Sequence, residues 1–128
     1  MRPLTKILLA DDEVCLLSLL EGYLGRLGYE VTACSSAPEA WARFESQAAD
    51  FSVVVLDMRM PDMSGQELAG RMLEMNPALR LVLSSGYPFD ISQIPVRDPA
   101  QIEFLQKPYS PSMLAKVIER LLKPRPEA

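Results

Sequence analysis

The run from Phe51 to Leu56 constrains the fold of this chain more than any other segment. Its sequence, FSVVVL, is almost entirely apolar and lacks the alternation of polar and apolar residues that marks a half-exposed strand. Such a run is typical of a strand that is buried on both faces, as in a parallel sheet. Parallel neighbours need long crossover connections, so helices are expected between the strands.

Strands and helices are predicted to alternate along the rest of the chain. The other strands, which are short apolar runs ending at a polar or turn-forming residue, are expected at 6–10, 30–34, 79–83 and 102–106. Helices, where apolar residues recur at helical spacing, are expected at about 14–27, 37–48, 66–75 and 111–122. This order predicts an α/β fold with a doubly wound, five-stranded parallel sheet of strand order 2-1-3-4-5.

Each helix carries an apolar stripe that is expected to face the sheet. The inward positions predicted for the first and third helices are Val14, Leu17, Leu20, Leu24, Leu27, Leu68, Met72 and Met75. The last helix is expected to turn inward Met113, Leu114, Val117, Ile118, Leu121 and Leu122.

The segment between Gly86 and Ile102 is the least regular part of the pattern. Pro88, Pro95 and Pro99 leave room for only about one helical turn. A short, distorted or mobile fourth helix is therefore expected around residues 90–94.

The bulk properties fit one domain and exclude several classes of function. A chain of 128 residues supports one hydrophobic core, expected over residues 1–123, with a frayed tail at 124–128. A net charge of −4 without a Lys/Arg cluster argues against nucleic-acid binding. No apolar run is long enough to span a bilayer or to form a signal peptide, so a cytoplasmic protein without a membrane partner is expected.

The sequence contains no histidine, which excludes His-based acid–base catalysis, Ser-His-Asp triads and histidine metal sites. The protein also has no histidine from which to donate a phosphoryl group. Cys15 and Cys34 match no zinc or disulfide spacing and are interpreted as small buried residues.

Polar side chains follow four of the predicted strands. Asp11 and Asp12 follow the first strand, Asp57 the third, Ser84 and Ser85 the fourth, and Lys107 the fifth. In an open parallel sheet, ligands bind at the carboxyl ends of the strands, so these groups are expected to converge on one pocket. Taken singly, each has a simpler explanation: the first two aspartates as helix caps, Asp57 and Ser85 as turn residues, Lys107 as a solvated surface lysine.

The chemistry of the combined set is more specific than that of its members. Three neighbouring carboxylates repel one another and need a cation, and Mg²⁺ favours carboxylate, water and phosphate oxygens. A carboxylate is also a nucleophile able to form an acyl phosphate. A lysine and a hydroxyl would then hold the other phosphoryl oxygens.

Four stretches together resemble the response regulator receiver domain, whose fold is flavodoxin- and CheY-like. They are KILLADDE (6–13), VVVLDMRMPDMSG (53–65), LVLSSGY (81–87) and FLQKP (104–108). The resemblance covers essentially the whole chain. It implies a phosphoacceptor domain of a two-component phosphorelay that takes its phosphoryl group from a histidine kinase or phosphotransfer protein and switches a face that binds a downstream protein.

The resemblance also implies the roles of individual residues. Asp57 is similar to the phosphorylated aspartate, and Asp12, Asp57 and the backbone carbonyl of Arg59 are similar to the Mg²⁺ ligands. Asp11 is expected to help through a water molecule. Lys107 matches the phosphate-binding lysine.

Three further roles follow from the same resemblance. Ser85, which precedes the small residue Gly86, matches the switch hydroxyl, and Phe104 matches the aromatic residue that changes rotamer on activation. The bond from Lys107 to Pro108 is expected to be cis.

The chain departs from the family in places that bear on the pocket and the output face. Arg59 and Tyr87, two residues beyond Asp57 and Ser85, are expected to overhang the pocket and to affect how easily water reaches the phosphate. The proline-broken segment 86–101 replaces a regular helix. Met58, Met60 and Met63 are interpreted as filling gaps or contacting a partner rather than as a soft-metal site.

Two other functions were weighed against the signalling interpretation. An aspartyl-phosphate phosphohydrolase of the haloacid-dehalogenase type needs a second aspartate two residues after the nucleophile, where this chain has Arg59. An FMN carrier needs hydroxyl and N–H groups in its first loop, where Asp11, Asp12 and Glu13 would repel a phosphate. No output domain is recognised after Lys123, so both a stand-alone regulator and a receiver from a hybrid histidine kinase remain open.

Overall fold

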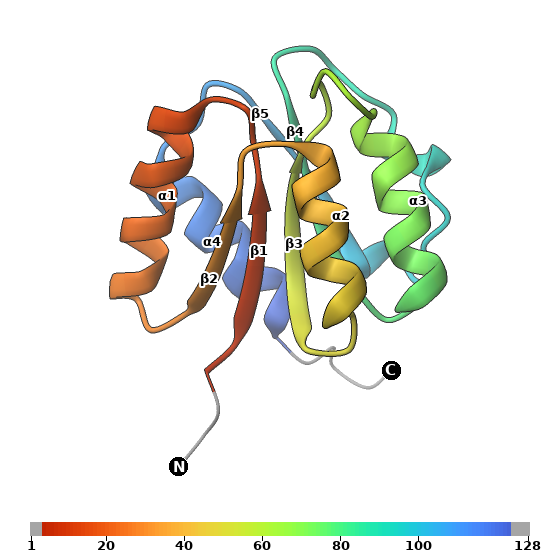
Figure 1. The fold of residues 1–128 in the computed structure, drawn as a ribbon, viewed down its shortest axis with the longest axis horizontal. Coiled ribbons are helices and arrows are strands. Elements are labelled where there is room, and N and C mark those ends of the chain that lie inside the picture. Colours follow the sequence, from red (N-terminus) through yellow and green to blue (C-terminus); the bar gives the residue numbers. More distant parts are fainter. Residues whose placement is uncertain (1–3, 124–128) are drawn as a thin grey trace.

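The computed structural model describes residues 4–123, and the tail expected at 124–128 lies outside them. Five strands form one parallel sheet in the order β2-β1-β3-β4-β5, as predicted. Figure 1 shows the sheet with helices on both faces. The strands are β1 (Lys6–Ala10), β2 (Glu30–Cys34), β3 (Phe51–Asp57), β4 (Arg80–Ser85) and β5 (Ile102–Gln106).

The helices lie in two pairs, one on each face of the sheet (Figure 1). They are α1 (Val14–Arg26), α2 (Ala37–Ser46), α3 (Gly65–Met75) and α4 (Pro111–Leu122). One apolar core joins the sheet to α2 and α3, and a second joins it to α1 and α4. Residues of β3 contribute to both cores, because its side chains alternate between two covered faces.

Polar residues at the helix starts explain where three of the four helices begin. The side chains of Ser36, Ser64 and Ser110 each accept a hydrogen bond from a backbone N–H of the first turn of α2, α3 and α4. Such a cap satisfies one of the N–H groups that a helix start leaves unpaired. Gly28 follows α1 with a φ of 100°, a conformation that favours glycine.

The segment between β4 and β5 contains two 3₁₀ turns in place of a regular helix. They are η1 (Ile91–Gln93) and η2 (Pro99–Gln101). The first confirms the short helix expected around residues 90–94, and the second was not predicted. Both are capped by an aspartate, because the side chains of Asp90 and Asp98 accept backbone N–H groups.

Several residues expected to face the core lie on the surface instead. Val14 is the first residue of α1, Leu27 follows its last turn and Met75 ends α3, and all three are exposed. Helical spacing alone does not show where a helix runs past the sheet that covers it. Met113, in the first turn of α4, is exposed for the same reason.

The two cysteines differ in environment. Cys34 is fully buried in the α2/α3 core, as expected, whereas Cys15 is exposed on α1, so its interpretation as a buried residue is wrong. Within the described part of the chain, no helix has both the length and the apolar character needed to cross a bilayer.

Candidate functional site

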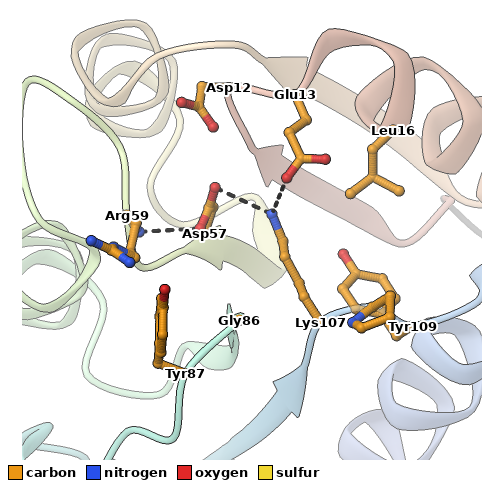
Figure 2. Close-up of a pocket in the computed structure, with 10 residues that line it drawn as sticks. Asp12, Glu13, Leu16, Asp57, Arg59, Gly86, Tyr87, Lys107 and Tyr109 are labelled. Carbon is orange, nitrogen blue, oxygen red and sulfur yellow. Dashed lines mark hydrogen bonds and ion pairs between the residues drawn. The ribbon is translucent and has the colours of Figure 1, made fainter.

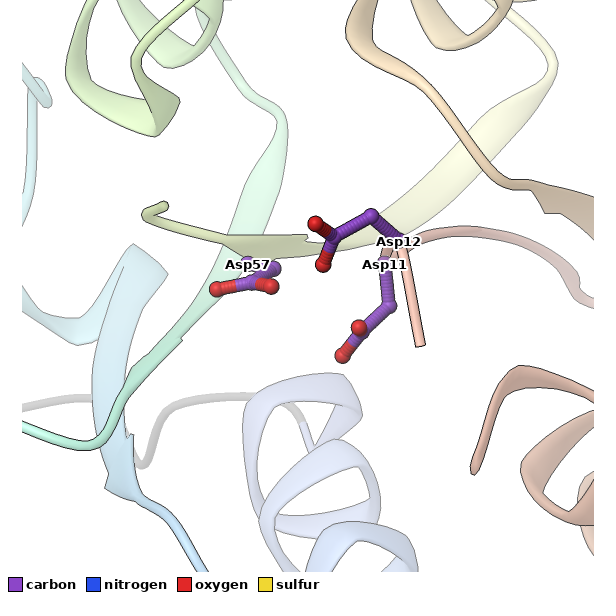
Figure 3. Close-up of side chains that lie close together, drawn as sticks. All are labelled: Asp11, Asp12 and Asp57. Carbon is purple, nitrogen blue, oxygen red and sulfur yellow. The ribbon is translucent and has the colours of Figure 1, made fainter. Parts of the chain in front are cut away.

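The carboxyl ends of β1 and β3 bring three aspartates together. Carboxylate oxygens of Asp11, Asp12 and Asp57 all lie within 4.8 Å of one another, and Figure 3 shows the side chains gathered beside the end of β3. Asp11 and Asp57 are buried, whereas Asp12 is exposed. The predicted convergence of these strand ends is therefore confirmed for the acidic groups.

Lys107, just after β5, reaches into the same cluster. Its Nζ lies 2.9 Å from Asp11 Oδ2, 3.3 Å from Asp57 Oδ2 and 3.2 Å from Glu13 Oε1. Figure 2 shows the lysine between Asp57 and Glu13. Its backbone is fixed as well, because Lys107 N–H donates to the carbonyl of Ser85 and continues the pairing of β5 with β4.

Both oxygens of Asp57 have a partner. Oδ1 accepts the backbone N–H of Arg59 at 3.1 Å, and Oδ2 faces Lys107. Burial raises the pKa of this carboxyl above its ordinary value, and the charge of Asp11 raises it further. The Arg59 hydrogen bond and Lys107 lower that pKa but do not cancel the effect of burial. The site thus holds a carboxylate whose charge is incompletely compensated.

Lys107 is held in its charged form. Burial lowers the pKa of its ammonium group, but the hydrogen bond and charge of Asp11, followed by the charge of Asp57, raise it well above the ordinary range. Tyr109 lines the same pocket, and burial together with the charge of Asp11 raises the pKa of its phenol to about 12. Lys107 is therefore a fixed positive charge at neutral pH.

The acidic side chains between β1 and α1 do not cap the start of α1. Asp11 Oδ1 accepts the N–H of Glu13, which precedes α1, and the N-cap residue Glu13 makes no side-chain cap hydrogen bond. Asp12 makes no hydrogen bond or ion pair within residues 4–123 and lines the pocket. The explanation of these acidic residues as ordinary helix caps is therefore wrong.

Glu13 and Tyr109 were not assigned to the site from the sequence. Glu13 directly follows the two aspartates, and Tyr109 follows Lys107 by two residues. Their proximity to predicted site residues was the one available signal. Neither residue is the first polar group after an apolar run, so the strand-end pattern does not indicate them.

Gly65 allows α3 to begin in close contact with the end of β3. A Cβ at this position would lie 2.8 Å from Met58 Cα and 3.1 Å from the carbonyl oxygen of Asp57. The Gly65 N–H donates to the Met58 carbonyl, which fixes the loop in this close approach. Met58 and Met60 are buried and Met63 is packed against the same core, so their gap-filling role is confirmed.

Ser85 ends β4, the strand that pairs with β3 beside Asp57. Its side chain is buried at the end of β4, and its Oγ accepts the N–H of Tyr87 at 3.1 Å. Asp57 lines one hollow of the surface, whereas Ser85 lines an adjoining one. Phe104 lies half-buried on β5, and the Lys107–Pro108 bond is cis, as expected.

Arg59 and Tyr87 stand at the mouth of the pocket, as the sequence predicted. The guanidinium carbon of Arg59 lies 4.9 Å from the centre of the Tyr87 ring. Figure 2 shows the two side chains beside Asp57, opposite Lys107 and Glu13. The pocket is therefore lined by Asp12 and Glu13 on one side and by the cation–aromatic pair of Arg59 and Tyr87 on the other.

The donor set suits a hard divalent cation. Three carboxylates at this spacing supply oxygen ligands. In the described residues the Asp12 side chain has no hydrogen bond or ion pair that would have to break before it binds an ion. Lys107 neutralises part of the charge of Asp11 and Asp57 but does not contact Asp12. A divalent ion beside Asp12 and Asp57 would therefore relieve repulsion that the lysine leaves.

Comparison with known proteins gives the family. Residues 7–119 match the response regulator receiver domain. The chain is 31% identical over 116 residues to the DNA-binding transcriptional regulator NtrC of Azospirillum brasilense, a match that covers 91% of this chain and 24% of that protein. It is 32% identical over 118 residues to the response regulator receiver protein CpdR of Brucella abortus, covering 91% and 96% of the two proteins.

Solved structures give the same result. A response regulator receiver protein from Sinorhizobium medicae is similar with a TM-score of 0.81 and 33% identity, and the match covers 93% of this chain and 94% of that one. The chain spans only about a quarter of the length of the NtrC relatives. Its strand order, its acidic cluster and these matches agree, and the chain therefore belongs to the response regulator receiver domain family.

Proposed function

We propose that Asp57 is the phosphoacceptor of this receiver domain and that Mg²⁺ assists the transfer. Receiver domains as a family are phosphorylated on an aspartate and bind Mg²⁺. The observation that carries the assignment is the position of Asp57, which is buried, belongs to the cluster with Asp11 and Asp12, and lies 3.3 Å from Lys107. Asp11 is also buried and contacts Lys107, but of these two aspartates only Asp57 lines the pocket.

The proposed transfer joins an oxygen of Asp57 to phosphorus as the phosphorus–nitrogen bond of a partner's phosphohistidine breaks. The bonding electrons remain on the imidazole nitrogen, which takes a proton from solvent. Asp12, Asp57 and the backbone carbonyl of Arg59 would hold Mg²⁺, with Asp11 acting through water. When bound, the ion neutralises charge on the phosphoryl oxygens.

This chain's own residues supply the remaining interactions. Lys107 already lies 3.3 Å from Asp57 Oδ2, so it is placed to contact a phosphoryl group on that carboxylate. Ser85 would provide a second hydrogen bond after turning toward Asp57. Each charge-assisted hydrogen bond contributes about 1.5–3 kcal/mol, and about 5.5 kcal/mol inverts a two-state population from 1:99 to 99:1. Two such bonds are therefore sufficient to drive a switch.

The partners follow from the family and its relatives. We propose that a histidine kinase or phosphotransfer protein supplies the phosphoryl group and that Phe104, with the face around segment 86–101, responds to it. The sensor kinase CckA of Brucella abortus, 28% identical over 118 residues, contains a region similar to this chain that makes up 12% of its length. A receiver within a kinase of that kind and a separate regulator are both compatible with the sequence.

The assignment is tested with acetyl phosphate and Mg²⁺, followed by intact-mass measurement. The wild type is expected to gain one phosphoryl group, and Asp57→Asn is expected to gain none. Asp62→Asn is a matched control, because Asp62 is an exposed aspartate in the adjacent loop. A phosphoryl group that persists in Asp57→Asn would show that another residue is the acceptor. Sustained turnover of p-nitrophenyl phosphate would instead favour the phosphohydrolase.

A further inference from the structure

Two hollows lie side by side at the carboxyl end of the sheet, and the acceptor and the switch hydroxyl are in different ones. Asp57 and Lys107 line the first hollow. Ser85 lines the second, together with apolar residues of the 86–101 segment. Arg59 and Tyr87 are the two residues that line both. Their cation–aromatic pair therefore lies along the boundary that the two hollows share.

The backbones of the same two residues hydrogen-bond to Asp57 and to Ser85. Arg59 N–H donates to Asp57 Oδ1 at 3.1 Å, and Tyr87 N–H donates to Ser85 Oγ at 3.1 Å. The guanidinium lies 4.9 Å from the ring centre, so the pair also connects the loop after β3 to the segment after β4. Movement of either residue is thus coupled to a group needed for phosphorylation or for the response.

We infer that Arg59 and Tyr87 form a partition that keeps Ser85 turned away from Asp57 until a phosphoryl group arrives. This inference rests on the proposed function of Asp57. The Tyr87 side chain is 64% exposed, which places the ring contact at the weak end of cation–π interactions. A phosphoryl group brings nearly two negative charges next to the guanidinium, and charge-assisted pairing with phosphate is the stronger interaction.

The expected sequence of events involves residues of this chain alone. Arg59 leaves the ring of Tyr87 for the phosphoryl oxygens, and Tyr87 then moves out of the position in which its N–H holds Ser85. Ser85 turns toward the phosphoryl group. Tyr87 and Arg59 are therefore positioning residues for Ser85, and the strength of their contact lowers the affinity for a phosphoryl group by about two- to five-fold.

A spectroscopic test uses beryllofluoride with Mg²⁺ as the phosphoryl analogue, a probe suggested by a DrrB receiver domain described as BeF₃-activated that is 26% identical to this chain. Proton signals of the Arg59 side chain are expected to be shifted by the Tyr87 ring in the free protein. The analogue should remove that shift. Arg71, exposed on α3 and paired with Glu67, provides an unshifted reference signal. A ring shift that is absent in the free protein, or that persists in the bound protein, would overturn the partition.

A binding test separates the partition from a direct effect of Arg59. Tyr87→Leu removes the ring but keeps the guanidinium, and it should tighten beryllofluoride binding about two- to five-fold when Ser85 is present. In a Ser85→Ala background the part of the gain that comes from releasing Arg59 should remain, whereas the part that comes from freeing Ser85 should be lost, so the gain should be smaller. Tyr87→Phe keeps a ring and should bind like the wild type. Equal tightening in both backgrounds would refute the link to Ser85.

The two tests distinguish failure of this inference from failure of the proposed function. If wild-type protein binds no beryllofluoride with Mg²⁺ and gains no phosphoryl group, the acceptor assignment fails and the partition falls with it. Suppose instead that the wild type binds the analogue, but the Arg59 signals do not shift and Tyr87→Leu tightens beryllofluoride binding equally with and without Ser85. The acceptor assignment then stands and the partition is wrong.

Discussion

Two connections leave the same edge of the sheet and are built in opposite ways. After β3, a loop of buried methionines leads within seven residues into the regular helix α3, which begins at Gly65 in close contact with Met58. After β4, the chain runs for 16 residues through three prolines and contains only two single 3₁₀ turns. The first connection positions Asp57, and the second follows Ser85.

The difference separates a fixed part of the site from an adjustable part. Regular hydrogen bonding and buried contacts resist local opening, whereas exposed segments with few backbone hydrogen bonds open at low free-energy cost. The connection after β3 therefore holds Asp57 in place although the neighbouring carboxylates repel it. The segment after Ser85 has the looser construction, with only two 3₁₀ turns between β4 and β5.

The largest expected effect is a loss of stability when one buried side chain in each connection, or in the helix it leads into, is shortened to alanine. Leu68 on α3 and Ile94 after η1 are both buried. Leu68→Ala is expected to destabilise by about 4 kcal/mol, because a regular helix cannot close the cavity, and Ile94→Ala by only about 2 kcal/mol, because the irregular segment relaxes. Urea unfolding measures both. Equal losses would contradict the proposed difference in packing.

A smaller effect is expected from adding a methyl group to one glycine in each connection. Gly65→Ala should cost about 1–3 kcal/mol, because its Cβ would meet backbone atoms at 2.8 and 3.1 Å. Gly86→Ala should change stability by less than about 0.5 kcal/mol, since nothing lies within 4 Å of its Cβ and its φ is not positive. Thermal unfolding distinguishes them. A tolerated Gly65→Ala would show that the acceptor loop is not tightly fixed.

The smallest expected effect concerns the negative charge of the Asp57 carboxylate. Because burial raises the pKa of Asp57 above its ordinary value of 3.8, protonation stabilises the folded protein, and that contribution is lost as pH rises through the raised pKa. Asp57→Asn should therefore melt at a slightly higher temperature than the metal-free wild type at pH 7, with the gap closing in acid. Lys107 keeps Asp11 and Glu13 as partners in the variant.

Mg²⁺ provides the control for that comparison. The ion is expected to stabilise the wild type more than Asp57→Asn, since the variant lacks one of the proposed carboxylate ligands. A metal-free variant that is less stable than the wild type at pH 7 would indicate that the ion pair with Lys107 outweighs the burial of Asp57.

The regular part of the fold could be predicted because its signals are local. The ranges expected for β1, β2 and β5 match the structure, and β3 is one residue longer than expected, since apolar runs ending at polar residues define buried strands well. β4 begins one residue later than expected and continues through Ser84 and Ser85, which were expected to follow it. The failures lie at helix ends. Val14 and Met75 continue the helical period, but whether a terminal turn is covered depends on where the sheet stops.

The site was predictable to the extent that it consists of strand ends. Asp11, Asp12, Asp57 and Lys107 converge as expected because parallel strands end at one edge. The hydrogen bond that Ser85 Oγ accepts from Tyr87 N–H was not predictable, because the strand pattern does not specify the turn that follows β4. The contact of Glu13 with Lys107 joins residues 94 positions apart, and no local pattern specifies it.

The sequence alone determined the order of strands and helices and the residues at the strand ends, because hydrophobic runs and their terminal polar groups are properties of neighbouring residues. The tertiary structure decided which oxygens Lys107 contacts, that the Asp57 carboxylate is buried at a cost, and that the Arg59 guanidinium lies over the Tyr87 ring. These features depend on distances and burial between segments far apart in the chain, and only the packed molecule sets them.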